Sequence, residues 1–166
     1  LVLMMTIPGL ALFYGGMTRT KSVLNMMMMS FGAMGVVGII YVLYGYSMSF
    51  GSENVGGIIA NPFEKFGLAS TDTIINPFGY EGYGNIPELA FVGFQLTFAV
   101  ITVALISGAV ADRVKFSTWM VFAALWVTFA YFPIAHMVWG GGLLSGAEGG
   151  LAAAVFGVTD GVANVV

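Results

Sequence analysis

Residues 91–142 read FVGFQLTFAVITVALISGAVADRVKFSTWMVFAALWVTFAYFPIAHMVWGGG, and the rest of the chain is interpreted from this segment. It consists of two long apolar segments joined by a very short basic connection, with aromatic residues collected toward one end. An apolar helix of roughly 20 residues, rising ~1.5 Å per residue, covers the ~30 Å hydrocarbon core of a bilayer. Each segment is about that long, so the stretch predicts a transmembrane helical hairpin.

The composition indicates the same environment. Hydrophobic residues make up 58% of the chain and charged residues only 8%, whereas about a quarter of the residues in a soluble domain are charged. Such a chain cannot cover its surface with polar groups, so lipid must be part of its solvent. The fold class is therefore predicted to be an all-α integral membrane protein. The chain has no cysteine, which excludes a disulfide framework and a thiolate metal site.

Apolar runs along the chain predict four transmembrane helices within one partial domain, residues 1–166. The first run begins without an initiator methionine and already inside an apolar segment, so the sequence is expected to be a fragment of a longer protein. The second run is long enough to span with tilt. The tail is either a loop with a short helix or the approach to a fifth span. The predicted spans are residues 1–17, 23–50, 89–111 and 116–139, with a polar connection at 51–88 and the tail at 140–166.

The cations predict the orientation. Four of the five lie in two short turns, residues 18–22 and 112–115, and short turns rich in Lys and Arg stay on the cytoplasmic side. The 51–88 connection, which carries five acids, and the tail are then outside. We expect these acids to form a solvated surface rather than a funnel for cations. Trp119 and Trp139, near the two ends of the fourth span, fit aromatic belts.

Four apolar residues in the third span are spaced four, three and four apart, which places them on one helical face: Phe94, Phe98, Ile101 and Leu105. The simpler interpretation of this stripe is packing or lipid contact. The alternative is the lining of a path. Aromatic faces attract a small cation, and an aliphatic passage beneath them would reject ions, because an unpaired charge is costly in a low dielectric. Ammonium, which can leave a proton behind, suits such a path, whereas sodium and potassium do not.

Other residues have structural interpretations. His136 is the single histidine, and a structural hydrogen bond is its expected role. Residues 140–142 are three glycines, which could form a flexible turn. Gly32, Gly35 and Gly38 recur every third residue and would keep one side of the second span thin, so that another helix can approach closely.

Three blocks of the sequence resemble the ammonium transporter family, which comprises the Amt, Mep and Rh proteins. Residues 8–16 (PGLALFYGG), followed by Arg19 and Lys21, resemble its first-helix signature. Residues 94–116, with the pattern FQxxFAxIT and then GAxAxRxKF, resemble its third-helix block. Residues 133–142 (PIAHMVWGGG) resemble the end of its fourth helix. The resemblance covers residues 8–25 and 91–142 well and the loops only loosely.

This resemblance implies the eleven-helix ammonium transporter fold, of which the chain would hold the first four helices. The family is usually a homotrimer with one hydrophobic pore in each subunit, located in the inner or plasma membrane as a multi-pass protein. Its substrate is ammonium or ammonia. The resemblance is also compatible with a cytoplasmic regulatory partner. No cofactor, metal or nucleic acid is expected.

The resemblance also assigns roles to individual residues. Phe98 and Trp139 match the outer ammonium site, and Phe94 joins Phe98 in the outer gate. The positions that match the pore lining are Ile101, Leu105, Phe13 and Tyr14. The family's outer-site serine, its two pore histidines and its recruiting aspartate lie beyond this chain. Asp160 is followed by Gly-Val-Ala-Asn and does not match the family's Asp-Phe-Ala-Gly-Gly motif.

Two other classes of protein are alternatives to a transporter. A membrane enzyme is disfavoured, because no nucleophile–base pair and no clustered carboxylates lie within the spans. A non-transporting assembly or structural segment remains the alternative, since helices with glycine-thinned faces could serve that role.

Overall fold

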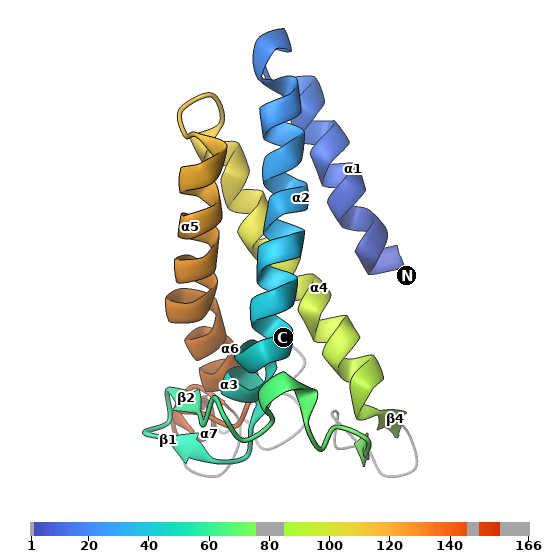
Figure 1. Cartoon of the computed structure of the whole chain (residues 1–166). Coiled ribbons are helices and arrows are strands. Elements are labelled where there is room, and N and C mark those ends of the chain that lie inside the picture. The colour runs from blue at the N-terminus through green and yellow to red at the C-terminus, as the bar shows by residue number, and fades with distance from the viewer. Residues whose placement is uncertain (1, 76–84, 146–149, 157–166) are drawn as a thin grey trace. The chain divides into compact units, whose positions relative to one another are not determined.

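The computed structural model describes residues 2–75, 85–145 and 150–156 (Figure 1). Most of this part of the chain is helical, as the sequence predicts. The helices are α1 (Val2–Met17), α2 (Val23–Ile40), α3 (Tyr46–Phe50), α4 (Glu88–Ile106), α5 (Phe116–Trp126), α6 (Phe132–Trp139) and α7 (Leu151–Phe156). Four strands of two residues each, which the sequence did not predict, lie between α3 and α4. They are β1 (Asn54–Val55), β2 (Ile59–Ala60), β3 (Ile74–Ile75) and β4 (Ile86–Pro87), paired antiparallel as β1–β2 and β3–β4.

Three helices are long and apolar enough to cross a membrane. They are Thr20–Phe50, Glu88–Val110 and Phe116–Trp139, close to the predicted 23–50, 89–111 and 116–139. A π-helical turn joins α2 to α3 at Tyr41–Gly45, and another joins α5 to α6 at Val127–Tyr131. The predicted first span forms α1. Its segment Met5–Met17 is an apolar helix that is shorter than the three long helices. Its role as a fourth span therefore remains a prediction.

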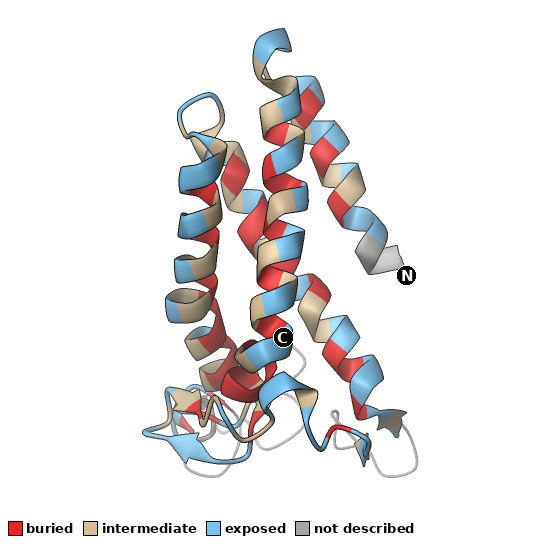
Figure 2. Cartoon of the chain, in the orientation of Figure 1, coloured by how far each residue is buried: buried red, intermediate tan, exposed pale blue. Residues whose placement is uncertain are grey.

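One compact unit contains residues 1–41 and 94–127, in which α2 packs against both α1 and α5. Small side chains allow this packing, because helices in lipid are held together by close contact rather than by the hydrophobic effect. Ala11, Ala33 and Ala123 are fully buried. Figure 2 shows the buried residues of α2 and α5 along their facing sides. At Gly32 an added Cβ would lie 2.7 Å from Met120 Sδ and 2.9 Å from the Phe116 ring, so α2 and α5 meet at this glycine.

One expectation for this unit was wrong. Trp119 does not present its ring to a membrane interface: its side chain is 1% exposed, and its Nε1–H donates to the carbonyl oxygen of Met29, 2.8 Å away. The indole therefore joins α5 to α2, and its buried N–H has a partner. Of the expected glycine-thinned face, the described residues cover only the part at Gly32. Gly32 makes a tight contact, whereas a Cβ at Gly35 or Gly38 would enter open space.

The other compact unit contains residues 42–93 and 128–166, in which α3 packs against α6 and β2. Tyr44 and Thr128 share a hydrogen bond of 2.8 Å between their hydroxyl groups. Gly45 leaves room for the ring of Phe132, which occupies the space that a Cβ would need. The described part of the tail contains the short helix α7; whether the tail is a loop or the approach to a fifth span remains a prediction.

The contact at Gly45 predicts a difference between two chemically identical substitutions. Gly45→Ala is expected to destabilise the protein by about 1–3 kcal/mol, because the new methyl group overlaps the buried Phe132 ring. Gly38→Ala is the matched control, because the added methyl meets nothing within 4 Å and alanine favours a helix by up to ~1 kcal/mol over glycine. Thermal unfolding of both variants in detergent checks the prediction, which fails if the two variants lose stability equally.

Candidate functional site

The apolar stripe predicted in the third span lies on α4 and stays open to the surroundings. Phe94, Phe98 and Leu105 are exposed, and Ile101 is half-buried. The other sides of the same helix are covered: Ala99, Val103 and Ala104 are fully buried, and Val92 and Val100 nearly so. The helix thus has a packed face and an exposed apolar face, and the exposed face carries the stripe that the sequence offered as a candidate path.

The two phenylalanines of this face form a pair. Their ring centroids lie 5.0 Å apart with an interplanar angle of 69°, an edge-to-face arrangement in which the positive edge of one ring meets the negative face of the other. Neighbouring hydroxyl groups turn away from the pair into the helix backbone. Thr97 donates to the carbonyl oxygen of Phe94 at 2.6 Å, and Thr102 donates to that of Phe98 at 2.7 Å. The face therefore remains apolar despite the threonines beside it.

Tyr14 of α1 meets the other end of this face. Its hydroxyl donates to the carbonyl oxygen of Leu105, 3.1 Å away, and its ring packs on Gly108, where an added Cβ would lie 2.9 Å from Cζ. The Phe13 ring is 60% exposed, and its centroid is 5.7 Å from that of Tyr14. The structure thus brings Tyr14 next to Leu105; their role in lining one path remains a prediction.

A cavity of about 290 Å³ opens beside Tyr14. Its lining is mostly apolar and consists largely of methionines and small residues. Tyr14 and Thr18 are the lining residues that carry a hydroxyl group. The lining residues are Tyr14, Met17, Thr18, Met26, Gly108, Ala109 and Ala111. The sequence predicted Tyr14 at this end of the path but did not single out the other residues, because methionine and alanine are ordinary packing residues in any membrane helix.

Trp139 is the last residue of α6 and is half-buried. It belongs to the unit formed by residues 42–93 and 128–166, whereas Phe94 and Phe98 belong to the other unit. The pairing of Trp139 with Phe98 in one site therefore remains a prediction.

The turn after Trp139 is closely packed rather than flexible, contrary to one expectation. Gly140 lies against the carbonyl oxygen of Ser49, and a Cβ at Gly142 would come within 2.5 Å of the Gly57 carbonyl oxygen. His136 is fully buried, and its Nδ1 lies 3.1 Å from the same Ser49 oxygen. The expected structural hydrogen bond of His136 is thus confirmed. Together these contacts fix the helix end that presents Trp139.

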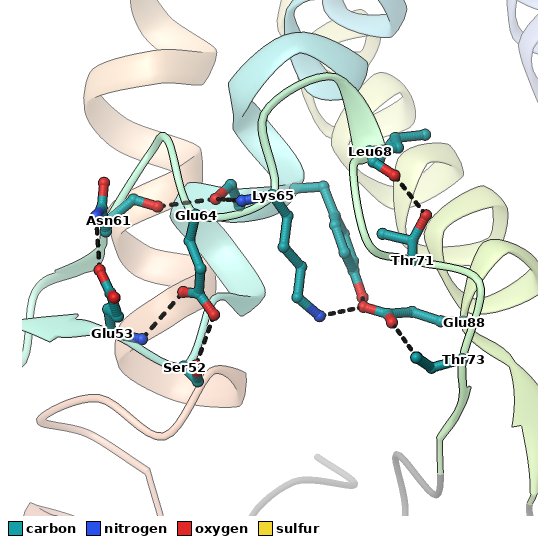
Figure 3. Close-up of polar contacts among 11 residues, drawn as sticks. Ser52, Glu53, Asn61, Glu64, Lys65, Leu68, Thr71, Thr73 and Glu88 are labelled. Carbon is teal, nitrogen blue, oxygen red and sulfur yellow. Dashed lines mark hydrogen bonds and ion pairs between the residues drawn. The ribbon is translucent and has the colours of Figure 1, made fainter.

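Sequence reasoning missed a polar network in the connection between α3 and α4 (Figure 3). Glu88, the first residue of α4, is 1% exposed. It forms an ion pair with Lys65 and accepts hydrogen bonds from Tyr46 Oη at 2.8 Å and Thr73 Oγ1 at 2.6 Å. The backbone N–H of Lys65 donates to Ser47 Oγ at 2.9 Å. The connection is thereby fixed to the end of one long helix and the start of the next.

Another acid of this connection is held in the same way. Glu64 accepts a hydrogen bond of 2.6 Å from Ser52 Oγ and one of 3.0 Å from the backbone N–H of Glu53. Partial burial opposes its charge, but these hydrogen bonds and the neighbouring Lys65 keep the pKa of Glu64 below its ordinary value. The expected solvated acidic surface is thus wrong for Glu88, which is buried, whereas Glu64 is held by hydrogen bonds while still partly exposed. The burial of Glu88 depends on its ion pair with Lys65. Only the tertiary structure reveals this pair, because the two residues lie 23 positions apart in the sequence.

Within the described ranges 2–75, 85–145 and 150–156, no group of three or more His, Cys, Asp or Glu residues could hold a metal ion. The polar groups that converge at Glu88 satisfy one another.

Comparison with known proteins identifies a family. Residues 1–157 match the model of the Ammonium Transporter Family. An ammonium transporter of Mycobacterium bovis is 55% identical over 148 residues, which cover 83% of this chain and 31% of the relative. An ammonium transporter of Aquifex aeolicus is 48% identical over 145 residues, which cover 87% of this chain and 33% of the relative.

Solved structures agree with the sequence comparison. The crystal structure of Candida albicans Mep2 superposes with a TM-score of 0.70 at 28% identity, over 92% of this chain and 30% of the Mep2 chain. The chain therefore spans about a third of the length of the curated relatives and solved structures it matches.

Proposed function

This chain belongs to the ammonium transporter family, and we propose that it forms part of the path by which the complete protein moves ammonium or ammonia across a cell membrane. Its three long apolar helices agree with a multi-pass membrane protein. The observation that carries the proposal is the open face of α4, on which the Phe94–Phe98 pair is followed by Ile101 and Leu105.

Chemistry explains why such a face suits this substrate. At the outer end, Phe98 and Trp139 would recruit the cation, because aromatic faces attract ammonium by about 0.5–2 kcal/mol, depending on how far the site excludes water. Phe94 would form the outer gate with Phe98. Beyond the gate the wall is aliphatic, and an unpaired charge there would cost several kcal/mol or more. Charge and ammonia therefore have to separate before the passage, and metal ions, which have no proton to lose, are rejected.

The path would continue from Leu105 to Tyr14 and Phe13 at the lower pore. The Tyr14 hydroxyl is already engaged by the Leu105 carbonyl oxygen, so this contact adds little polarity to the wall. In the arrangement that we propose, the turns at 18–22 and 112–115 face the cytoplasm, and the 51–88 connection and the tail face outward, in the inner or plasma membrane. The complete protein would be a homotrimer, with its cytoplasmic side available to a regulatory partner.

Uptake of methylammonium, with ammonium as the competitor, tests this function. Cells that carry the complete protein are expected to take up methylammonium, and ammonium is expected to suppress that uptake. The control is the same cells without the protein, and insertion is checked in isolated membranes. Correct insertion without uptake would overturn the transport function and favour a non-transporting assembly segment.

A further inference from the structure

In the connection between α3 and α4, two exposed phenylalanines, Phe63 and Phe66, flank two half-buried charged residues. Phe63 is 75% exposed and Phe66 is 46% exposed, and their rings stack with centroids 6.0 Å apart and planes 28° apart. Between them, Glu64 and Lys65 are half-buried and bonded to other parts of the protein. A segment that faces water normally shows the opposite arrangement, with its charges outside and its rings inside.

The hydrogen bonds of the segment fix its level relative to the apolar helices. Lys65 pairs with Glu88 through its side chain and with Ser47 through its backbone. Glu88 is the first residue of an apolar helix of 23 residues, and at ~1.5 Å per residue that helix spans about 34 Å, little more than the ~30 Å hydrocarbon core. Ser47 lies in the last turn of the preceding long helix. Lys65 is therefore held near one surface of the hydrocarbon core.

We propose that Phe63 and Phe66 form an interfacial anchor that inserts into the headgroup layer of the membrane at this surface. Aromatic rings at the level where a span ends gain by leaving water for the boundary between headgroups and acyl chains. Two exposed aromatic rings stacked side by side mark such an interaction surface. Through this anchor the connection contacts lipid. The Lys65–Glu88 pair determines the depth at which the two rings lie in the headgroup layer.

Spin labelling tests the proposal in the complete protein. This chain has no cysteine, so Phe63→Cys introduces a single thiol once any cysteine elsewhere in the protein has been replaced. The labelled protein is placed in vesicles of phosphatidylcholine and phosphatidylglycerol, and collision rates are measured with oxygen, which concentrates in lipid, and with a water-soluble nickel chelate. A ratio of oxygen to nickel collisions above one at position 63 is expected.

Two control positions calibrate the readout. Phe129→Cys lies within a long apolar helix and is also 75% exposed, so it should report lipid. Asn54→Cys lies on the exposed strand β1 and should report water, with a ratio below one. A ratio at position 63 as low as that at position 54 would show a water-facing loop and overturn the proposal. Low collision rates with both reagents would show that protein covers the pair, from another segment or a neighbouring subunit, and would also overturn it.

A second variant tests the role of the ion pair. Adding Lys65→Gln to the labelled Phe63→Cys protein is expected to lower the ratio of oxygen to nickel collisions, because the segment is no longer held at the level of Glu88. An unchanged ratio would remove Lys65 from the anchor. Methylammonium uptake is measured on the same samples, so that failure of the anchor and failure of transport are read separately.

Discussion

Replacing Trp139 by alanine in the complete protein is expected to weaken ammonium recruitment at the outer site. The indole face contributes about 0.5–2 kcal/mol to the binding of a cation, and about 1.4 kcal/mol corresponds to a tenfold change in affinity. The ammonium concentration that half-inhibits methylammonium uptake should therefore rise roughly 2- to 30-fold.

Two variants separate this effect from general damage. Trp139→Phe keeps an aromatic face at the end of α6 and should retain most of the recruitment. Trp126→Ala removes a tryptophan from the same long helix, Phe116–Trp139, but from a position outside the proposed site, so it should leave the half-inhibiting concentration unchanged. A normal uptake curve in Trp139→Ala, with an unchanged half-inhibiting ammonium concentration, would exclude Trp139 from the outer site.

Breaking the Lys65–Glu88 ion pair is expected to cause the largest loss of stability. The Glu88 side chain is 2% exposed and that of Lys65 22% exposed. Removing one partner of a buried pair leaves an uncompensated charge and costs about 3–5 kcal/mol. Because Lys65 keeps some contact with water, we expect Lys65→Met to cost about 3 kcal/mol. Glu88→Gln should cost less, because the glutamine oxygen can still accept from Tyr46 or Thr73.

A double-mutant cycle measures the coupling. The variant carrying both Lys65→Met and Glu88→Gln should be more stable than the sum of the single losses predicts, by at least about 1 kcal/mol, as measured by unfolding in detergent. The comparison pair is Arg19 and Asp112, whose side chains are 76% and 30% exposed and 4.0 Å apart. Its cycle should give at most about 0.5 kcal/mol. Additive losses at Lys65 and Glu88 would show that the pair contributes no coupling.

Some features of this protein follow from the sequence alone. The three long helices were predicted within a few residues, because an apolar run of about 20 residues has few alternatives to a helix in lipid, where every backbone polar group needs a partner. That Phe94, Phe98, Ile101 and Leu105 share one face of α4 followed in the same way, since residues spaced four, three and four apart lie on one side of any helix. The family followed from three motifs in the order in which they occur.

Pairings between distant residues were decided only by the tertiary structure. The sequence gives no sign that Glu88 meets Lys65 or that His136 lies beside the Ser49 carbonyl oxygen, because these partners are 23 and 87 residues apart. The same holds for Trp119, whose amphipathic ring would suit a membrane interface as well as the Met29 carbonyl oxygen that it binds. Helix periodicity fixes which face a residue occupies. Only packing decides what covers that face, because the contacts of a small, polar or aromatic side chain depend on which helix or loop packs against it.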